Sequence, residues 1–232
     1  MDNDLFSMSS RIRYSFPIHR GGKVLVLTPH PDDETIGCAG SLLCLGQKDI
    51  EITVVLFTQP KEQKKSEDRL KEFDKATKFI GCIKHIQLGY PDGDLKDYYK
   101  SAKDSLERII SEEKPDIIFT PYIFDYHYDH KCVSKMLSEV IKDENVLIAM
   151  YEVWVPILHP SYYIDITQYW EKKQHALTIY KSQDEIYSII QKASMLNQLR
   201  AQLSMRKNVS YIESFQCFKG ERFRQLIEPI YL

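Results

Sequence analysis

Short apolar runs alternate with helical patterns from residue 23 to residue 153, and this alternation permits few folds. The expected strands are 23–28, 50–58, 83–88, 116–120 and 146–153, and the expected helices are 34–45, 66–80, 101–111 and 131–142. The run 52–57 is β-branched and apolar enough for a central strand. Strands that alternate with helices form a parallel sheet covered on both faces. We therefore expect a Rossmann-like three-layer α/β fold with a mainly parallel central sheet.

The last third of the chain has a different pattern. We expect a strand at 162–166, helices at 168–180 and 184–205, and a β-prone tail at 211–218. Ser182 and Glu185 have the capping-box spacing that would start the second helix. No linker composition or repeat interrupts the chain. We expect one domain, 1–232, with an α/β core at about 22–155 and a C-terminal helical and β extension at about 156–232.

The composition gives no electrostatic case for a nucleic-acid partner. The formal net charge is -2, and the Lys and Arg residues are spread along the chain. A hydrophobic content of 43% indicates a soluble globular protein with enough apolar material for a core. No uncharged stretch approaches the roughly 20 residues that span a bilayer, and the first residues lack a signal-peptide pattern. We expect a cytoplasmic protein without a transmembrane segment.

The five cysteines predict neither a disulfide framework nor a thiolate zinc site. They are odd in number and form no Cys-x-x-Cys pair. All lie among apolar neighbours, as small buried residues do: Cys38, Cys44, Cys82, Cys132 and Cys217. This usage favours a reducing compartment.

Two clusters of ionisable residues directly follow expected strands. The first contains His30, Asp32, Asp33 and Glu34. The second contains His127, Asp129 and His130. Charges crowded at the end of a buried strand repel one another unless a cation or a ligand compensates. Because ligands bind beyond the carboxyl ends of parallel strands, the two clusters predict a metal or catalytic site.

A catalytic zinc commonly has three protein ligands and one open position, and two histidines with a carboxylate supply such a set. A bound metal lowers the pKa of water to about 7, and the remaining acid and histidine could act as general base and general acid. Isolated histidines are usually surface residues or hydrogen-bonded core residues. We therefore assign no site role to the isolated histidines His19, His85, His159 and His175. Glu34 could likewise be an acid at a helix start.

The motifs resemble those of the PIG-L-like zinc-dependent de-N-acetylases, which include N-acetylglucosaminyl-phosphatidylinositol deacetylases and bacterial deacetylases of thiol-linked amino sugars. The first motif is 29–34 and the second is 127–130. Further similarity lies at 69–81, 88–93, 165–167, the Lys172/Lys173 pair, Ser182-Gln183 and 211–215. The resemblance extends over about 22–218, and it implies the Rossmann-like fold.

The resemblance also implies roles for both clusters. It implies a Zn²⁺ site, with Fe²⁺ or another divalent metal as the alternative, whose ligands are His30, Asp33 and His130. Asp32 matches the general base that takes a proton from the zinc-bound water. His127 matches the residue that stabilises the oxyanion or protonates the leaving amine, and Asp129 would hold its imidazole in position.

The implied substrate is a small N-acetylated amino sugar of the N-acetylglucosamine type, from which acetate is released. Arg69 and Asp92 match positions that contact sugar hydroxyls in relatives. The sequence departs from the family at Tyr128, a spacer that is often Pro, and at Tyr180, which is often His. Tyr126 receives no role. A homo-oligomer is compatible with the resemblance.

Other functions stay open at this stage. An amidase acting on a non-sugar or thiol-conjugate amide is one alternative, and a non-catalytic carbohydrate-binding homologue is another. A nucleotide-binding domain is disfavoured because the first βα turn lacks a Gly-x-Gly-x-x-Gly loop. Several aromatic residues could line a sugar cleft or simply pack: Tyr122, Phe124, Tyr126, Tyr128, Trp154, Tyr162 and Tyr163.

Overall fold

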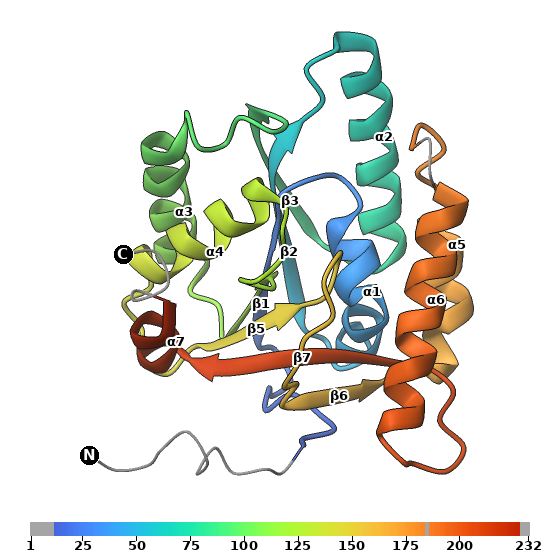
Figure 1. The fold of residues 1–232 in the computed structure, drawn as a ribbon. Helices are drawn as coiled ribbons and strands as arrows, with labels where there is room; N and C mark the ends of the chain where they lie inside the picture. The colour runs from blue at the N-terminus through green and yellow to red at the C-terminus, as the bar shows by residue number, and fades with distance from the viewer. Residues whose placement is uncertain (1–11, 184–185, 228–232) are drawn as a thin grey trace.

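A computed structural model describes residues 12–183 and 186–227 (Figure 1). The strands are β1 Lys23–Thr28, β2 Glu51–Gln59, β3 Lys84–Pro91, β4 Ile117–Pro121, β5 Leu147–Tyr151, β6 Tyr162–Asp165 and β7 Ile212–Lys219. The helices are α1 Asp33–Gly46, α2 Gln63–Phe79, α3 Tyr99–Glu113, α4 Tyr128–Val140, α5 Trp170–Leu177, α6 Ile186–Leu203 and α7 Gly220–Ile227.

In the described residues the strands form one seven-stranded sheet in the order β3-β2-β1-β4-β5-β7-β6. The first five of these strands are parallel, and β7 pairs antiparallel with both β5 and β6. The predicted three-layer fold with a mainly parallel sheet is confirmed. The strands expected in the C-terminal extension join this sheet at its β5 edge.

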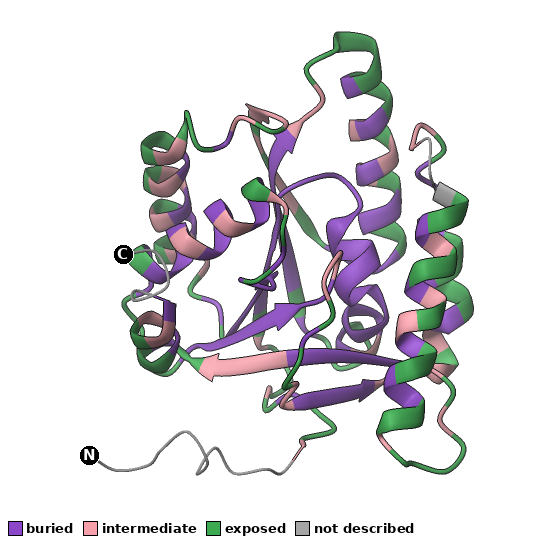
Figure 2. Ribbon diagram, viewed as in Figure 1, coloured by how far each residue is buried: buried purple, intermediate pink, exposed green. Residues whose placement is uncertain are grey.

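Alternate residues of the parallel strands face two separate hydrophobic layers. In β1, Val24 and Val26 contact the layer under α1, α2 and α5, whereas Leu25 and Leu27 contact the layer under α3, α4 and α7. Because successive side chains of a strand point to opposite faces, a strand covered on both sides must be apolar throughout. Figure 2 shows that α1 is buried along most of its length, since α5 and α6 lie over it.

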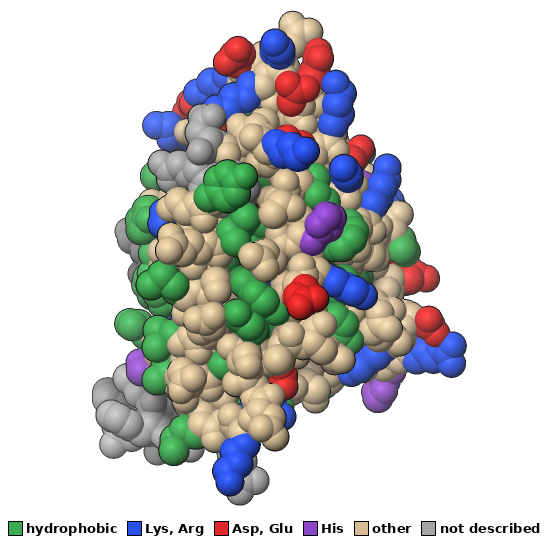
Figure 3. Space-filling view, turned by 90° about the vertical axis from the view of Figure 1, so that its right-hand side faces the viewer, with side chains coloured by type: hydrophobic (Ala, Val, Ile, Leu, Met, Phe, Trp, Pro, Cys, Tyr) green, Lys and Arg blue, Asp and Glu red, His purple; other side chains and the backbone are tan. Residues whose placement is uncertain are grey.

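The side of the molecule formed by α2, α5 and α6 is turned toward the viewer in Figure 3, where hydrophobic side chains lie over the middle and charged ones gather at the upper end, to which α2 extends. Part of this apolar surface comes from α6, in which Met195, Leu199 and Leu203 are exposed at intervals of four residues.

Several element boundaries differ from the predicted ones. β3 continues through the turn-forming residues to Pro91, because Tyr90 and Pro91 pair with the end of β2 after a shift in register. The expected helix 168–180 is the shorter α5, preceded by a 3₁₀ turn. Helix α7 is absent from the prediction, although Phe223 and Ile227 have helical spacing. The proposed capping contact of Glu185 lies outside the described residues.

The strand order creates a topological switch point between β1 and β4. The chain runs from β1 outward through β2 to β3 and then crosses back to β4 on the other side of β1. Ligands of open α/β sheets bind at the carboxyl ends of the strands that flank such a point. The two clusters of ionisable residues follow β1 and β4, and they therefore meet there.

Candidate metal centre

The loop between β1 and α1 carries the first cluster on a strained turn. Asp32 has φ 118°, a left-handed value that non-glycine residues rarely adopt. Such a conformation costs about 1–3 kcal/mol and persists only where other contacts fix it. The carbonyl oxygen of Asp32 accepts the N–H groups of Thr35 and Ile36, which begins α1. The turn gives the side chains of Asp32 and Asp33 different neighbours.

Three donor atoms from the two clusters lie close together. His30 Nδ1 is 3.2 Å from Asp33 Oδ2 and 3.3 Å from His130 Nε2, and the latter two atoms are 3.1 Å apart. A tetrahedral zinc with ligand bonds of about 2.0–2.2 Å needs its ligand atoms about 3.3 Å apart. All three residues are buried. This donor triangle, formed by His30, Asp33 and His130, therefore fits three ligands of a divalent metal.

A carboxylate lies behind each histidine of the donor triangle. Asp129 Oδ2 is 3.1 Å from His30 Nε2, and Asp125 Oδ2 is 3.4 Å from His130 Nδ1. Carboxylates in these positions orient metal-binding imidazoles and make them more basic. Burial by itself lowers the pKa of both histidines, but the surrounding carboxylates outweigh it, and the pKa of His130 rises to about 9. This negative field favours a cation.

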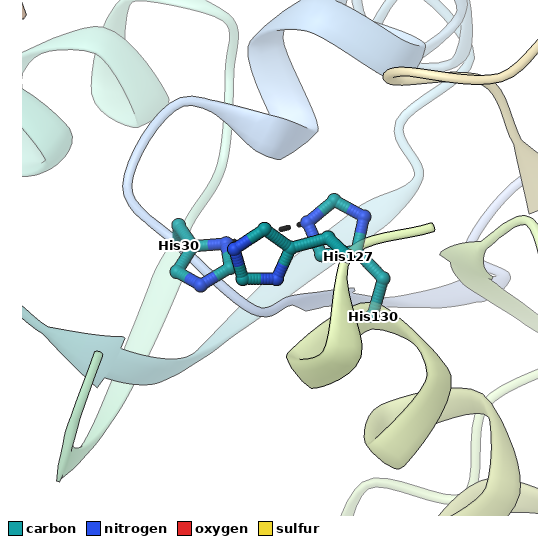
Figure 4. A group of neighbouring side chains, drawn as sticks. All are labelled: His30, His127 and His130. Carbon is teal, nitrogen blue, oxygen red and sulfur yellow. Dashed lines mark hydrogen bonds between the residues drawn. The ribbon is translucent and has the colours of Figure 1, made fainter. Parts of the chain in front are cut away.

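Other metal-ligating atoms surround His30. His127 contacts both other histidine rings, with centroids 4.4 and 5.0 Å away (Figure 4), and Asp92 joins Asp129 on the Nε2 side of His30. On that side, however, Asp129 already accepts two N–H groups from the loop 93–95, and the Asp92 side chain is 45% exposed. The Nδ1 side offers two buried ligands and is the better metal site.

Asp32 lies next to the donor triangle with partners of its own. Gln183 Nε2 donates a hydrogen bond of 2.8 Å to Asp32 Oδ2, and Arg69 Nη2 lies 3.6 Å from the same oxygen. Burial and the charge of Asp33 raise the pKa of Asp32 to about 8, against the opposing effect of Arg69. Within the described residues, Nε and Nη1 of Arg69 are buried without a hydrogen-bond partner. The site thus contains a carboxylate, Asp32, that can take up a proton near neutral pH. It also contains buried hydrogen-bond donors on Arg69.

His127 is half-buried, and its Nδ1 has no hydrogen-bond partner in the part of the chain that the structure describes. Burial, together with His30 and His130, lowers the pKa of His127, which favours a neutral imidazole. The resemblance implies that Asp129 holds the His127 imidazole in position. The structure instead directs Asp129 to His30 Nε2, because the N–H groups of the loop 93–95 hold its carboxylate there.

Glu34 lies beneath the centre and bonds to hydroxyl groups. Its carboxylate accepts a hydrogen bond of 2.7 Å from Tyr180 and further bonds from Thr28 and Thr35. Burial raises the pKa of Glu34. Tyr180, whose role the sequence leaves open, is fully buried and supports Glu34 rather than facing a substrate.

The structure brings all eight predicted site residues together: the donor triangle, Asp32 with Arg69, and His127 near Asp92 and Asp129. Two further residues, Asp125 and Gln183, were not assigned a role from the sequence. Asp125 precedes His127 by two positions, and Gln183 belongs to the Ser182-Gln183 pair. The sequence therefore contained a weak indication that each residue lies near the site. Tyr162 and Tyr163 are buried at 3% and 4% exposure, which supports packing for them.

Fold and site together define a class: α/β proteins with a His/Asp metal-type centre at the switch point of a parallel sheet. The model of the GlcNAc-PI de-N-acetylase family, PIG-L, matches residues 25–141. The chain therefore belongs to the PIG-L family, and the predicted resemblance is confirmed.

Individual relatives agree with this assignment. The uncharacterized deacetylase YaiS of Escherichia coli is 33% identical over an alignment of 116 positions, which covers 47% of this chain and 63% of that protein. The diacetylchitobiose deacetylase of Thermococcus kodakarensis is 25% identical over 72% of each chain. A solved structure of N,N'-diacetylchitobiose deacetylase from Pyrococcus horikoshii superimposes with a TM-score of 0.73 at 23% identity, covering 87% of this chain and 85% of that one.

None of the helices in the described ranges combines the length and the apolar character that crossing a membrane requires.

Proposed function

We propose that this protein is a metal-dependent N-deacetylase that hydrolyses the acetamido group of an N-acetylated amino sugar and releases acetate and a free amine. The donor triangle, with the Asp32 carboxylate beside it, is the observation that carries the proposal. Zn²⁺ is the metal that suits two imidazoles and one carboxylate, and Fe²⁺ is the alternative.

The proposed metal ligands are His30, Asp33 and His130. A divalent metal held there supplies Lewis-acid chemistry, which polarises a carbonyl oxygen and acidifies water. Asp32 then acts as the general base that removes a proton from the attacking water. Its raised pKa suits this role near neutral pH, and the Gln183 hydrogen bond fixes its carboxylate.

His127 has two possible tasks in amide hydrolysis, which are stabilising the oxyanion and protonating the leaving amine. Among the described residues its Nδ1 has no hydrogen-bond partner, which supports a role toward a ligand, because a buried polar atom without a hydrogen bond is costly unless something uses it. Asp129 contributes through His30, whose ring it orients.

The proposed sugar contacts come from Arg69 and Asp92. The two guanidinium nitrogens of Arg69 that lack a hydrogen-bond partner within the described ranges are donors for sugar hydroxyls, and the partly exposed Asp92 carboxylate is an acceptor. The names of the relatives support an amino-sugar conjugate, since diacetylchitobiose is an N-acetylated disaccharide.

The test is acetate release from a panel of N-acetylglucosamine conjugates by the purified protein, with its metal content measured alongside. We expect turnover by the zinc-loaded protein and a loss of at least about 10²-fold in Asp32→Asn, typical of a removed general base. Asp32→Asn should still bind zinc, because Asp32 lies outside the donor triangle. The proposal fails if zinc-loaded protein releases no acetate from any sugar in the panel, or if Asp32→Asn is as active as the wild type.

A further inference from the structure

Glu72 on α2 is an acid for which the proposed function has no use, although its contacts lead to Asp32. It lies one turn after Arg69, so the two side chains share one face of the helix. Arg69 Nη2 reaches Asp32 Oδ2 directly, at 3.6 Å. Glu72 instead contacts the segment 178–183, which follows α5, the helix that lies beside α2 (Figure 1).

Both carboxylate oxygens of Glu72 bind Ser182. Oε1 accepts the backbone N–H of Ser182 at 2.9 Å, and Oε2 accepts its hydroxyl group at 2.6 Å. The two residues are partly buried and lie 110 positions apart in the chain. Hydrogen bonds to a charged acceptor are stronger than neutral ones, and two of them to one residue fix its orientation as well as its position. Ser182 is therefore fixed to α2.

Gln183, the next residue, connects this fixed point to Asp32. Its Nε2 donates a hydrogen bond of 2.8 Å to Asp32 Oδ2, and its backbone N–H donates to the carbonyl oxygen of Tyr180 at 3.1 Å. A long amide side chain loses rotamer freedom when it binds, and it holds a carboxylate in one place only if its own backbone is fixed. The two bonds between Ser182 and Glu72 provide that fixation.

The Asp32 turn requires support from outside. Its φ of 118° persists only where surrounding contacts hold it. Tyr180, which lies in the same segment as Gln183, bonds to Glu34 at 2.7 Å, so this segment is tied to both acids that flank Asp33. Its attachment to α2 through Glu72 therefore bears on the position of the Asp32 carboxylate.

We propose that Glu72 is a positioning residue for the general base. Through its two bonds to Ser182 it holds Gln183 against Asp32, and so it keeps the Asp32 carboxylate in its orientation for proton removal. This inference rests on the proposed function, in which Asp32 is the general base. In the described residues Glu72 makes no hydrogen bond or ion pair with Asp32 or with the donor triangle, so its effect passes through Gln183.

A double-mutant cycle tests this route. Glu72→Ala should lower kcat for acetate release by about tenfold, since misplacing a catalytic group by about 1 Å is costly, and it should leave KM within about twofold. Gln183→Ala already lacks the donor to Asp32, so adding Glu72→Ala to it should lower kcat by less than about twofold more. A role in folding alone would instead multiply the two losses.

Two further variants separate positioning from general stability. Glu72→Gln keeps an oxygen for the Ser182 N–H and gains an amide donor for the Ser182 hydroxyl, so it should restore kcat to within about threefold of the wild type. Glu67→Ala removes an exposed acid of the same helix, which accepts a bond of 3.3 Å from Gln63, and it should match the wild type. If Glu72→Ala does not fold, Ser182→Ala takes its place in the cycle and should lower kcat by about threefold, because it removes only the hydroxyl bond.

Amide hydrogen exchange in the purified protein without substrate measures the same contacts without turnover. The Ser182 N–H should exchange about tenfold faster in Glu72→Ala, because its charged acceptor is lost. The N–H groups of Thr35 and Ile36, which bond to the carbonyl oxygen of Asp32, should also exchange faster, both in this variant and in Gln183→Ala.

The inference is overturned if Glu72→Ala keeps its full kcat, if the double variant shows the product of the two single losses, or if Glu72→Ala leaves the exchange of Thr35 and Ile36 unchanged. Failure of the proposed function has a different signature. In that case neither the wild type nor any variant releases acetate, and the exchange rates still decide whether Glu72 holds the segment against Asp32.

Discussion

Asp125 Oδ2 lies 3.4 Å from His130 Nδ1, and both side chains are completely buried. The Asp125 carboxylate is itself held by the backbone N–H groups of His127 and Trp154. Although this contact is an ion-pair distance rather than a hydrogen bond, a carboxylate fixed on the Nδ1 side of an imidazole favours a proton on that nitrogen and leaves Nε2 free for a metal. Asp125 is therefore a positioning residue for the donor triangle.

Asp125→Asn should weaken zinc binding by about 10–100-fold, the usual effect of removing a carboxylate behind a metal-binding histidine. Competition with a zinc-binding dye measures the affinity directly. Asp143→Asn, an exposed aspartate that likewise caps a nearby backbone N–H, should bind zinc like the wild type. Unchanged affinity in Asp125→Asn would show that His130 is oriented by other contacts or is no ligand.

Zinc should stabilise the folded protein, because a ligand that binds only the native state adds about 2.7 kcal/mol at 100 times its Kd. The melting temperature of chelator-treated protein should rise on addition of zinc, and the rise should vanish in His30→Ala and His130→Ala. His85→Ala is a suitable control, since His85 pairs with Asp74 and belongs to neither of the two clusters that form the donor triangle. A zinc effect that persists in both triangle variants would contradict the ligand assignment.

Gln183→Ala should lower kcat by about 10–100-fold, because a hydrogen bond to a charged group contributes about 1.5–3 kcal/mol. The missing partner is the 2.8 Å donor to Asp32 Oδ2. Zinc content and melting temperature should stay near the wild-type values, since Gln183 contacts no residue of the donor triangle through a hydrogen bond in the described ranges. A variant with full kcat would mean that Asp32 does not depend on this donor.

Much of the fold and of the centre could be predicted because the signals are local. Apolar strands alternate with helical patterns, and parallel strands place their carboxyl ends at one edge. Two clusters that follow parallel strands were therefore expected at one edge of the sheet, and the strand order, which the sequence did not predict, places β1 beside β4. The ionisable residues themselves are dense enough in sequence to be noticed.

The supporting contacts could not be predicted because they join distant segments. Gln183 reaches Asp32 across 151 positions, and nothing in the Ser182-Gln183 pair indicates that partner. The resemblance assigned Asp129 to His127, whereas the backbone of the loop 93–95 holds its carboxylate toward His30.

Lys173 is another residue whose contacts join distant segments and could not be predicted, and its burial allows a test of stability. Its Nζ is buried and donates to Glu213 at 2.7 Å and to the carbonyl oxygen of Ile36 in α1, while the exposed Lys172 does not share this environment. Lys173→Met should cost about 3–5 kcal/mol, because Glu213 would remain buried without its cation. Lys172→Met should change the free energy of unfolding in urea by less than about 0.5 kcal/mol. Equal stability of the two variants would show that the buried pair is not coupled to folding.

Gly37 tests how closely α1 must approach the sheet. A Cβ at this position would overlap the ring of Tyr151, which is fully buried and donates a hydrogen bond to the carbonyl oxygen of Leu27. Gly37→Ala should therefore destabilise the protein by about 1–3 kcal/mol in urea unfolding. Gly46→Ala, at the end of the same helix with open space around it, should be neutral or stabilising by up to about 1 kcal/mol. Because Asp33 lies one turn before Gly37, displacement of α1 should also weaken zinc binding, and a destabilised Gly37→Ala protein with wild-type zinc affinity would show that the donor triangle tolerates movement of the helix.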